Sequence, residues 1–565
     1  MGAADPLQPT FTQSEYLKAS FGGRMTLLAK SWAHQGLGLP RVILVFYLLK
    51  MLVYVWVWTR FCRFIPGLVA TPSVGTIGDF WLHPLAFQKA VLWSIMFESL
   101  GLGCASGPLS GRNWPLFGLH IHALWPGSYK YPLFYPVLGN KRGLLDVTLY
   151  FLLQASLLRA LLSPAHSLEL LIPVVALLVV AGVLDKTIML AARGEHYWSM
   201  TMCIVLSLLT GGNDDVWVAG CKIVQCSLWF WAGASKLNPH FAYAVMNMTT
   251  NHPFMPKFVR RAVVRGENDI RPSLVCKLLA HGALLFEVGT ALAFNFLPDV
   301  ATVPTAVLTV VFHTHILLNV PAAVPLEWNL MVMYGVRFLF VQYQHVVPCV
   351  VLPQHPGLAV FVALMGFLIP LVGNLKPGWV SFLFAMRYYA GNWCWSLFVF
   401  DDYAHVIEIG KRAKTVFAFD AQKQIEDMGT TPEVALMLGN IGTVVGALHL
   451  NMRWLQLVIP KHIPEEKLKM STPVLDGMLV GGLLGWSFGD AHLAQHALYD
   501  ALQELMQFKA GQCLVFHGEG QPLFGNTHHY QVFDLGKSTS VPLEEGDIPT
   551  AKLLSLQPWG PTKAD

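Results

Sequence analysis

The chain has little charge for its length. Only 13% of its 565 residues are Asp, Glu, Lys or Arg, whereas 54% are apolar, and the mean hydropathy is +0.48. Soluble domains carry about a quarter of charged residues. This shortage, together with several long apolar runs, predicts a multi-pass protein of the lipid bilayer. The net charge of +4 is small, so a nucleic acid partner is not expected.

The sequence also lacks the short motifs of common catalytic and cofactor sites. Its nine cysteines form no CxxC pair and most lie in apolar runs, which is typical of buried free thiols. There is no P-loop, GxGxxG or GxSxG motif. The cofactor, if there is one, therefore stays unknown. The start of the chain lacks the basic-then-apolar pattern of a signal peptide, so the first apolar run is expected to remain as an anchor.

The apolar runs predict an all-α polytopic bundle of about 9–11 spans, with a transmembrane domain over residues 41–400. Residues 1–40 are expected to form an amphipathic lead-in. The aromatic-rich stretch 379–400 is expected to lie at the headgroup level. The candidate spans are 42–60, 89–105, 145–163, 168–190, 198–211, 216–236, 275–297, 302–319, 328–347 and 357–373.

The distribution of basic residues predicts the orientation. Lys and Arg gather in loops 106–144 and 237–274, which fall on the same side as the N-terminus when the spans are counted. The positive-inside rule places this side in the cytoplasm. From about Asp401 the charge density becomes normal and the periodicity mixed, so residues 401–565 are expected to form a small cytosolic α+β domain.

Ionisable residues inside a span are costly and therefore point to function or to a specific pair. Lys50 and Glu98 each lie in the middle of an apolar run. The simpler interpretation is a buried ion pair that fixes the register of two neighbouring spans. The alternative is that both line an internal polar cavity.

The 216–236 run carries a polar stripe. Lys222, Gln225, Trp229 and Lys236 are spaced so that they share one face of a helix, which should point into the bundle rather than to lipid. Two interpretations of Lys236 stay open. It either reaches the interface from the helix end, or it is a desolvated amine that acts as a base or anion clamp.

Other polar residues of the following spans are candidates to meet Lys236. They are His281, Glu287, His313, His315, Glu327 and Asn329. The histidine spacings do not match a helical metal pair, so a zinc or di-iron site is not predicted. Two prolines precede Glu327 and Asn329, and broken backbone at membrane depth is tolerated where it lines a cavity. His196, in ARGEHYWSM at a span end, is a further cavity-lining candidate.

One acidic pair allows a different chemistry. Asp214 and Asp215, in GGNDDVW, have the residue types of a site for Mg²⁺ and a diphosphate. The same residues also suit a solvated turn with a helix N-cap. The sequence leaves both interpretations open.

Three segments resemble a known superfamily. WFWAGASKLNPHF resembles the "F-AG--KL-+-W" segment of the vitamin K-dependent γ-carboxylase-like transmembrane superfamily, and HTHILLNVPAAVPLEWNLM resembles its "H-LLN-----FP" segment. GEHYWSM is similar to its tryptophan/histidine segment. The resemblance covers roughly residues 85–345. It implies that Lys236 is the catalytic base and carries over His315 and Asn319.

A second resemblance extends over nearly the full chain. LGLGCASGPL, DKTIMLAARGEHY, MRYYAGNW and GWSFGDAHL together resemble an uncharacterised multi-pass family of actinobacterial type. This resemblance implies the architecture but no reaction. Carboxylases of the first superfamily use a large non-cytosolic domain on peptide glutamates, whereas the extra domain here is expected to be cytosolic. Protein carboxylation is therefore not expected.

Three functions follow from these patterns. The first is a membrane enzyme that acts on a lipophilic quinone, isoprenoid or lipid and uses Lys236 as base. The second is a non-catalytic lipid carrier, transporter or assembly factor. The third is a Mg²⁺-dependent prenyl-diphosphate enzyme that uses Asp214 and Asp215.

Overall fold

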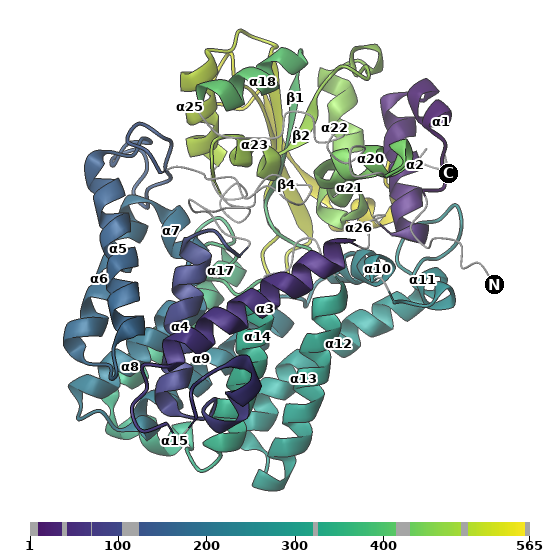
Figure 1. Ribbon diagram of the computed structural model, residues 1–565. Coiled ribbons are helices and arrows are strands. Elements are labelled where there is room, and N and C mark those ends of the chain that lie inside the picture. Colours follow the sequence, from purple (N-terminus) through teal and green to yellow (C-terminus); the bar gives the residue numbers. More distant parts are fainter. Residues whose placement is uncertain are drawn as a thin grey trace.

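The structure is a computed structural model with two parts, a helical membrane unit and a sheet unit that lies at one end of it (Figure 1). It describes residues 9–36, 42–68, 70–103, 124–252, 254–319, 326–413, 430–486 and 495–559. The segments Val320–Pro325 and 487–494, which include the two prolines before Glu327 and most of the GWSFGDAHL motif, lie outside the described residues.

The membrane unit is a bundle of helices of different lengths (Figure 1). Four helical stretches among the described residues are long and apolar enough to cross a bilayer, at Leu144–Leu162, Leu274–Phe296, Asp299–Asn319 and Pro356–Leu375. The main helices are α3 (Val42–Cys62), α4 (Pro84–Ser99), α5 (Leu144–Leu162), α6 (Leu168–Leu184), α7 (Lys186–Ala191), α8 (Ser199–Leu209), α9 (Asp214–Ala234), α12 (Leu274–Phe296), α13 (Thr302–Asn319), α14 (Leu326–Gly335), α15 (Pro348–Val351), α16 (Pro356–Ala363) and α17 (Ile369–Leu375).

Several predicted spans are shorter or interrupted in the structure. The run 198–211 forms only α8, and the run 328–347 forms α14 followed by a π-helical turn, η4 (Val336–Gln342). A π-turn adds one residue per turn and shifts the face that follows it. The helical membrane architecture is as predicted, but the described part holds fewer full-length spans than the nine to eleven expected.

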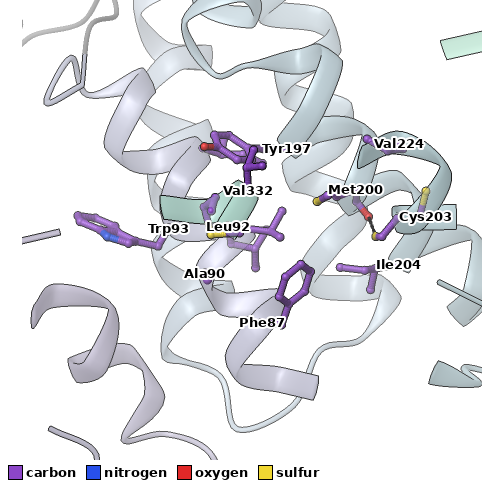
Figure 2. Packing of buried hydrophobic residues seen from close by; sticks show 14 of the residues in the cluster. Phe87, Ala90, Leu92, Trp93, Tyr197, Met200, Cys203, Ile204, Val224 and Val332 are labelled. Carbon is purple, nitrogen blue, oxygen red and sulfur yellow. Dashed lines mark hydrogen bonds between the residues drawn. The ribbon is translucent and has the colours of Figure 1, made fainter. Parts of the chain in front are cut away.

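The core of the membrane unit forms where α4, α8, α9 and α14 meet (Figure 2). Phe87 of α4 stacks on Phe338 with ring centroids 4.4 Å apart, and both rings stack with Trp217 of α9. The close approach of α8 and α9 depends on Gly220, because a Cβ there would lie 2.7 Å from Cys203 Sγ. These contacts fix the position of α9, which carries the polar stripe.

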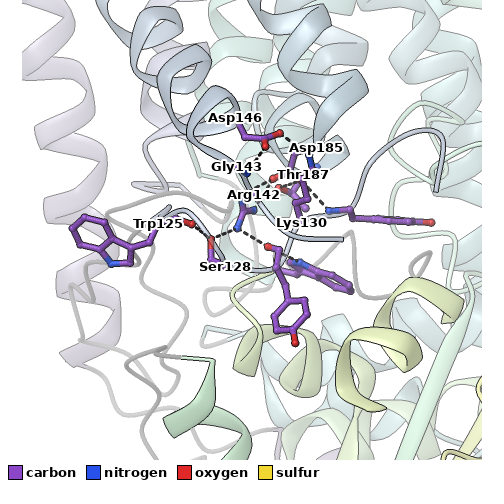
Figure 3. A network of polar contacts seen from close by, with 11 residues as sticks. Trp125, Ser128, Lys130, Arg142, Gly143, Asp146, Asp185 and Thr187 are labelled. Carbon is purple, nitrogen blue, oxygen red and sulfur yellow. Dashed lines mark hydrogen bonds and ion pairs between the residues drawn. The ribbon is translucent and has the colours of Figure 1, made fainter. Parts of the chain in front are cut away.

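Part of the predicted basic loop is held rigidly against the helices (Figure 3). Arg142 donates from Nε and Nη2 to Asp185 Oδ2, at 2.9 and 2.6 Å. Lys130 Nζ lies 2.7 Å from Asp146 Oδ1. All four side chains are buried. Buried ion pairs of this kind fix geometry even when their net energy is small. The loop therefore docks onto the α6–α7 junction in a defined way.

The sheet unit contains five antiparallel strands in the order β2-β1-β3-β4-β5. They are β1 (Trp395–Phe400), β2 (Val474–Asp476), β3 (Cys513–Gly518), β4 (Thr527–Asp534) and β5 (Glu544–Pro549). The packed helices include α18 (Tyr403–Arg412), α20 (Pro432–Gly439), α21 (Ile441–Leu448), α22 (Leu455–His462), α23 (Gly477–Leu483), α25 (Gln495–Met506) and α26 (Thr550–Ser555).

Strand β1 differs from the expectation for residues 379–400. It is buried at every position and pairs with β2 on one side and β3 on the other. Trp395, Leu397 and Val399 enter one apolar cluster, whereas Phe398 and Phe400 enter a second one. A strand covered on both faces is apolar throughout, which the sequence alone does not separate from a membrane segment.

The N-terminal lead-in is part of the sheet unit. Helix α1 (Gln13–Lys18) is capped by Thr12 and α2 (Phe21–Gln35) by Ser20. The buried face of α2, with Phe21, Met25 and Trp32, joins the same cluster as Trp454 of the C-terminal region. In Figure 1 both helices lie beside α20 and α21. Helices α10 (Phe241–Asn251) and α11 (Lys257–Ala262) connect this unit to the membrane helices.

Candidate functional site

The polar stripe of α9 faces the interior of the bundle, and each of its members has a defined partner. All four side chains are buried. Lys222 Nζ donates to the carbonyl oxygens of Tyr343 and Val346, at 2.9 and 2.6 Å. Gln225 Nε2 donates to the carbonyl oxygen of Val332 at 2.8 Å. Trp229 and Lys236 reach side chains of other helices.

Lys236 forms an ion pair with Glu287 of α12. The Nζ atom lies 2.5 Å from Glu287 Oε1 and also contacts Oε2. It lies 4.5 Å from the centroid of the Phe241 ring. Only 5% of the Lys236 side chain and 7% of the Glu287 side chain are exposed. The amine is therefore enclosed by protein atoms.

The approach of α9 to α12 at this pair depends on Gly233. A Cβ at this position would lie 2.7 Å from Val288 Cγ2 and 3.0 Å from the carbonyl oxygen of Leu284. Real Cβ atoms do not pack that closely without displacement of the neighbour. Gly233 thus sets the helix separation at which Lys236 and Glu287 can meet.

His313 of α13 connects α9 to α14. Its Nε2 accepts a hydrogen bond from Trp229 Nε1 at 2.9 Å, and its Nδ1 lies 3.0 Å from Asn329 Oδ1. An amide oxygen only accepts, so Nδ1 carries the proton and His313 is the neutral Nδ1–H tautomer. Both ring nitrogens are engaged, which makes His313 a positioning group between three helices.

Two other predicted histidines lie elsewhere. The side chain of His281 is exposed at the start of α12, and its Nδ1 pairs with the carbonyl oxygen of Lys277 at 2.6 Å. His315 is exposed on α13 and its ring stacks on that of His252, with centroids 5.6 Å apart. Asn319, carried over by the resemblance, is buried. The structure does not bring His281 or His315 to Lys236.

Glu327 meets Glu98, and the two carboxyl groups are within hydrogen-bonding reach of each other. Both are buried. Glu98 also lies against Gly103, where a Cβ would approach to 2.2 Å from Oε2. Lys50 Nζ donates to the carbonyl oxygen of the same glycine at 3.0 Å.

Lys50 and Glu98 are therefore neighbours at Gly103. No ion pair joins them among the described residues, since Lys50 donates to the backbone. The two side chains approach the same glycine without the direct ion pair that the simpler interpretation expected. This leaves the Glu98 carboxyl group facing Glu327.

The segment ARGEHYW adds further polar side chains to this place. Arg193 has a left-handed backbone with φ 52° and ψ 57°, and the next five residues form a π-helical turn, η2 (Gly194–Trp198). Left-handed non-glycine residues and π-turns cluster at functional sites. The turn buries Glu195, His196 and Tyr197 together. The Arg193 guanidinium interacts electrostatically with Glu98, Glu195 and Glu327.

Trp328 joins the two groups of residues. Its ring lies edge-on to those of His313 and His196, with centroids 6.1 and 6.2 Å away, and 5.3 Å from that of Tyr388. Tyr388 in turn donates to Glu195 Oε1 at 2.8 Å. Glu327, Trp328 and Asn329 are consecutive, so the first turn of α14 touches both groups. We call Glu98, Arg193, Glu195, His196, Tyr197, Glu327, Trp328 and Tyr388 the polar core.

Many polar atoms of the polar core lack a hydrogen-bond partner among the described residues. Apart from the contact between Glu98 and Glu327, these atoms are Glu98 Oε1 and Oε2, Glu195 Oε2, His196 Nδ1 and Nε2, Tyr197 Oη, Glu327 Oε1 and Oε2, and Trp328 Nε1. Buried polar groups are almost always paired in folded proteins, and an unpaired one costs about 1–3 kcal/mol. So dense a group indicates a place that water or a ligand fills.

A family model matches residues 1–564, which is nearly the whole chain. The chain belongs to the family described as transmembrane protein of unknown function (DUF3556). This membership confirms the prediction of an integral membrane protein. No curated protein and no solved structure gives a match.

The acidic pair at the start of α9 is not gathered with other ligands. Asn213 caps the helix through Asp215 N at 3.0 Å, and Asp214 Oδ1 accepts from Trp217 Nε1 at 2.8 Å. Asp215 pairs with the exposed His345 at 3.4 Å. Among the residues that the structure describes, no three His, Cys, Asp or Glu side chains are arranged to hold a metal ion.

The turn that carries Lys236 is tied to the sheet unit. Four residues further on, His240 Nε2 lies 2.7 Å from Gln521 Oε1, and Gln521 Nε2 donates to the carbonyl oxygen of Thr527. Burial lowers the pKa of His240 to about 4, so it is neutral at physiological pH. The bond from the neutral His240 ring to Gln521 fixes the position of the α9–α10 turn against the sheet.

Several members of the polar core could not be selected from the sequence. Arg193, Tyr197, Trp328 and Tyr388 are ordinary residues of apolar surroundings, and nothing in their spacing marks them. The GEHYW segment gave the only usable signal, since two charged residues at a span end are unusual. Its π-helical geometry and the left-handed Arg193 are not readable from residue types.

Proposed function

We propose that this protein is a membrane-embedded enzyme that acts on a lipophilic substrate, with Lys236 as the proton-transferring group. The observation that carries this proposal is the enclosure of the Lys236 amine against the Glu287 carboxylate. A proton that moves from the ammonium to the carboxylate leaves a neutral amine and a neutral acid. Separated charges are unfavourable in an apolar interior, so this exchange is cheaper there than in water.

The neutral amine is the form that removes a proton from a substrate. Glu287 then holds the proton that Lys236 gave up, and the amine takes the substrate proton. The pair at that point carries one proton more than at rest, and it returns to its resting form when Glu287 passes its proton to the product or to water. The resemblance of WFWAGASKLNPHF to the carboxylase-like superfamily supports the same role for Lys236. His313 and Asn329 position the neighbouring helices rather than exchange protons.

The substrate class proposed is a lipid, isoprenoid or quinone, because the site lies among helices of a membrane family. The basic loops and both described ends of the chain are proposed to face the cytoplasm. The sheet unit, which holds residues from both ends, would lie on that side.

A non-catalytic carrier, transporter or assembly factor is the second candidate. It is favoured by one observation, namely that both oxygens of Glu287 contact the Lys236 amine. A pair closed in this way also serves to hold two helices in register. The two candidates differ in what happens when both charges are removed together.

The test uses a host strain that lacks the gene and is complemented with variants. Lys236→Met alone is expected to lower the amount of protein, since Glu287 is left buried without a partner. The double variant Lys236→Met/Glu287→Met removes both charges and is expected to restore the amount. The measurements are the protein level in membranes and the lipid and quinone profile by mass spectrometry.

If Lys236 is the base, the double variant is present at the wild-type level but its profile is that of the strain without the gene. A wild-type profile at a normal protein level contradicts the proposal and favours the carrier. Lys89→Met is the matched control, because Lys89 is a fully buried helix lysine that donates to backbone carbonyls outside the site. Its profile per unit of protein should match that of the wild type.

A further inference from the structure

The polar core and its surroundings hold groups of both signs. The acids of the polar core are Glu98, Glu195 and Glu327. Arg193 interacts electrostatically with all three acids, and Lys50, just outside the polar core, lies beside Glu98 at Gly103. Carboxyl groups and positive groups therefore lie close to one another. An anion would meet the carboxylates and a cation would meet Arg193 and Lys50, so a charged ligand gains little.

The unpartnered atoms of the polar core include both donors and acceptors. Tyr197 and Trp328 offer an O–H and an N–H, whereas Glu195 Oε2 accepts. The ring of His196 offers one nitrogen of each kind. A phosphate or carboxylate only accepts and an ammonium only donates, so either would leave half of these atoms unpaired. A hydroxyl group donates and accepts at once.

Aromatic rings surround these atoms. The ring of His196 stacks on that of Tyr197 with centroids 4.7 Å apart, and Trp328 lies edge-on to His196 and beside Tyr388. Rings of this kind give a flat, rigid apolar surface with polar edges. The C–H faces of a polyhydroxylated ring fit such a surface while its hydroxyl groups reach the edges.

We infer that the polar core binds the uncharged, hydroxyl-bearing head group of a lipid, such as a sugar. Glu98, Glu195, Glu327 and His196 accept from its hydroxyl groups, and Tyr197, Trp328 and Arg193 donate to them. The inference deepens the proposed function and rests on it in one respect, since it takes this ligand to be the substrate on which Lys236 acts. The first turn of α14 links the two places through Glu327, Trp328 and Asn329.

The test measures binding of four amphiphiles of equal chain length to the full-length protein in phosphatidylcholine nanodiscs. They are octyl-β-glucoside, octanol, octyl phosphate and octyltrimethylammonium, each used below its micelle concentration. Binding is followed by the shift of the unfolding temperature. Octyl-β-glucoside is expected to give a saturable shift, with an affinity at least about tenfold above those of the two charged compounds. The affinity for octanol should lie between the affinity for octyl-β-glucoside and the affinities for the two charged compounds.

Two conservative variants locate the site. Tyr197→Phe removes only a hydroxyl group that has no partner among the described residues, so the fold should be retained. It is expected to weaken octyl-β-glucoside binding about tenfold. Tyr499→Phe is the matched control, because the Tyr499 hydroxyl is equally buried and unpartnered but lies in the sheet unit. Its affinity should equal that of the wild type.

Stronger binding of a charged amphiphile overturns the inference, as does an equal response to all four or to none. An unchanged affinity in Tyr197→Phe overturns the assignment to the polar core. Lys236→Met/Glu287→Met separates this inference from the proposed reaction. If that variant binds octyl-β-glucoside normally and also keeps a wild-type lipid profile, the base role fails while the head-group site stands.

Discussion

Glu287 is the partner of Lys236, at 2.5 Å between Oε1 and Nζ, across 51 residues of sequence. The pair joins α9 to α12 at the point where the polar stripe ends. Its two members are buried to a similar extent. A lysine at a helix end usually reaches toward the headgroups, and here a carboxylate on the next helix holds it inside.

The first prediction concerns the stability of this pair. Lys236→Met should destabilise the protein by about 3–5 kcal/mol, because it leaves an uncompensated carboxylate in an apolar interior. Lys236→Met/Glu287→Met should recover most of that loss. Thermal unfolding of the purified protein in nanodiscs measures both. A double variant as unstable as the single one would show that the pair contributes more than the removal of an unpaired charge.

The second prediction concerns the helix spacing. Gly233→Ala places a methyl group 2.7 Å from Val288 Cγ2 and should cost about 1–3 kcal/mol through overpacking. Gly289→Ala, on α12, is the control, because no atom lies within 4 Å of the added Cβ. Because alanine has a higher helix propensity than glycine, Gly289→Ala should leave the stability of the protein unchanged or raise it by up to about 1 kcal/mol. Equal effects of the two substitutions on the unfolding temperature would contradict the close approach at Gly233.

The third prediction concerns His313. Trp229→Phe removes the donor to His313 Nε2 and leaves that nitrogen buried without a partner. The expected cost is about 1–3 kcal/mol. Trp379→Phe is the control, since that side chain is 77% exposed and should change stability by less than about 0.5 kcal/mol. If both variants unfold at the wild-type temperature, the Trp229–His313 bond is not maintained in the protein.

The fourth prediction concerns pH. Asp476 caps α23, where its Oδ1 accepts from Met478 N at 2.8 Å, and its side chain is fully buried. Burial raises the pKa of Asp476 to about 6, above the unfolded value near 3.8. The folded state therefore binds more protons between these values, and the contribution of Asp476 to stability falls as the pH rises from about 4 to 6.

Asparagine at this position keeps the cap and does not titrate. Asp476→Asn should therefore be more stable than the wild type by about 1–3 kcal/mol at pH 7.5, with the difference vanishing near pH 4. The measurement is the difference in unfolding temperature between the two proteins across that range. A difference in unfolding temperature between Asp476→Asn and the wild type that stays the same at every pH would contradict the prediction.

The sequence was most informative where one physical pattern dominated. The 3.6-residue period of Lys222, Gln225 and Trp229 predicts one polar face, and in the structure these side chains point into the bundle. A polar face on an apolar membrane helix is unfavourable against lipid, so it points into the protein. The sequence does not predict the partners of this face, because Glu287 and His313 reach it only through the relative positions of three separate helices.

The sequence was least informative where tertiary packing covers every face. The residues Trp395–Phe400 resemble a membrane segment in sequence, but they form an interior strand of the sheet that two apolar clusters cover. The left-handed backbone of Arg193 is equally invisible, because any residue type except proline can be forced there by its surroundings. These are the positions at which context, and not propensity, decides the conformation.

The shared core of α2 and the C-terminal region has a consequence for biosynthesis. The apolar face of α2 leaves the ribosome before the membrane helices, whereas Trp454 and the strands that complete its core leave after them. Helix α2 must therefore keep its apolar face unburied while the membrane helices are made. During this period a chaperone or the membrane surface has to shield that face.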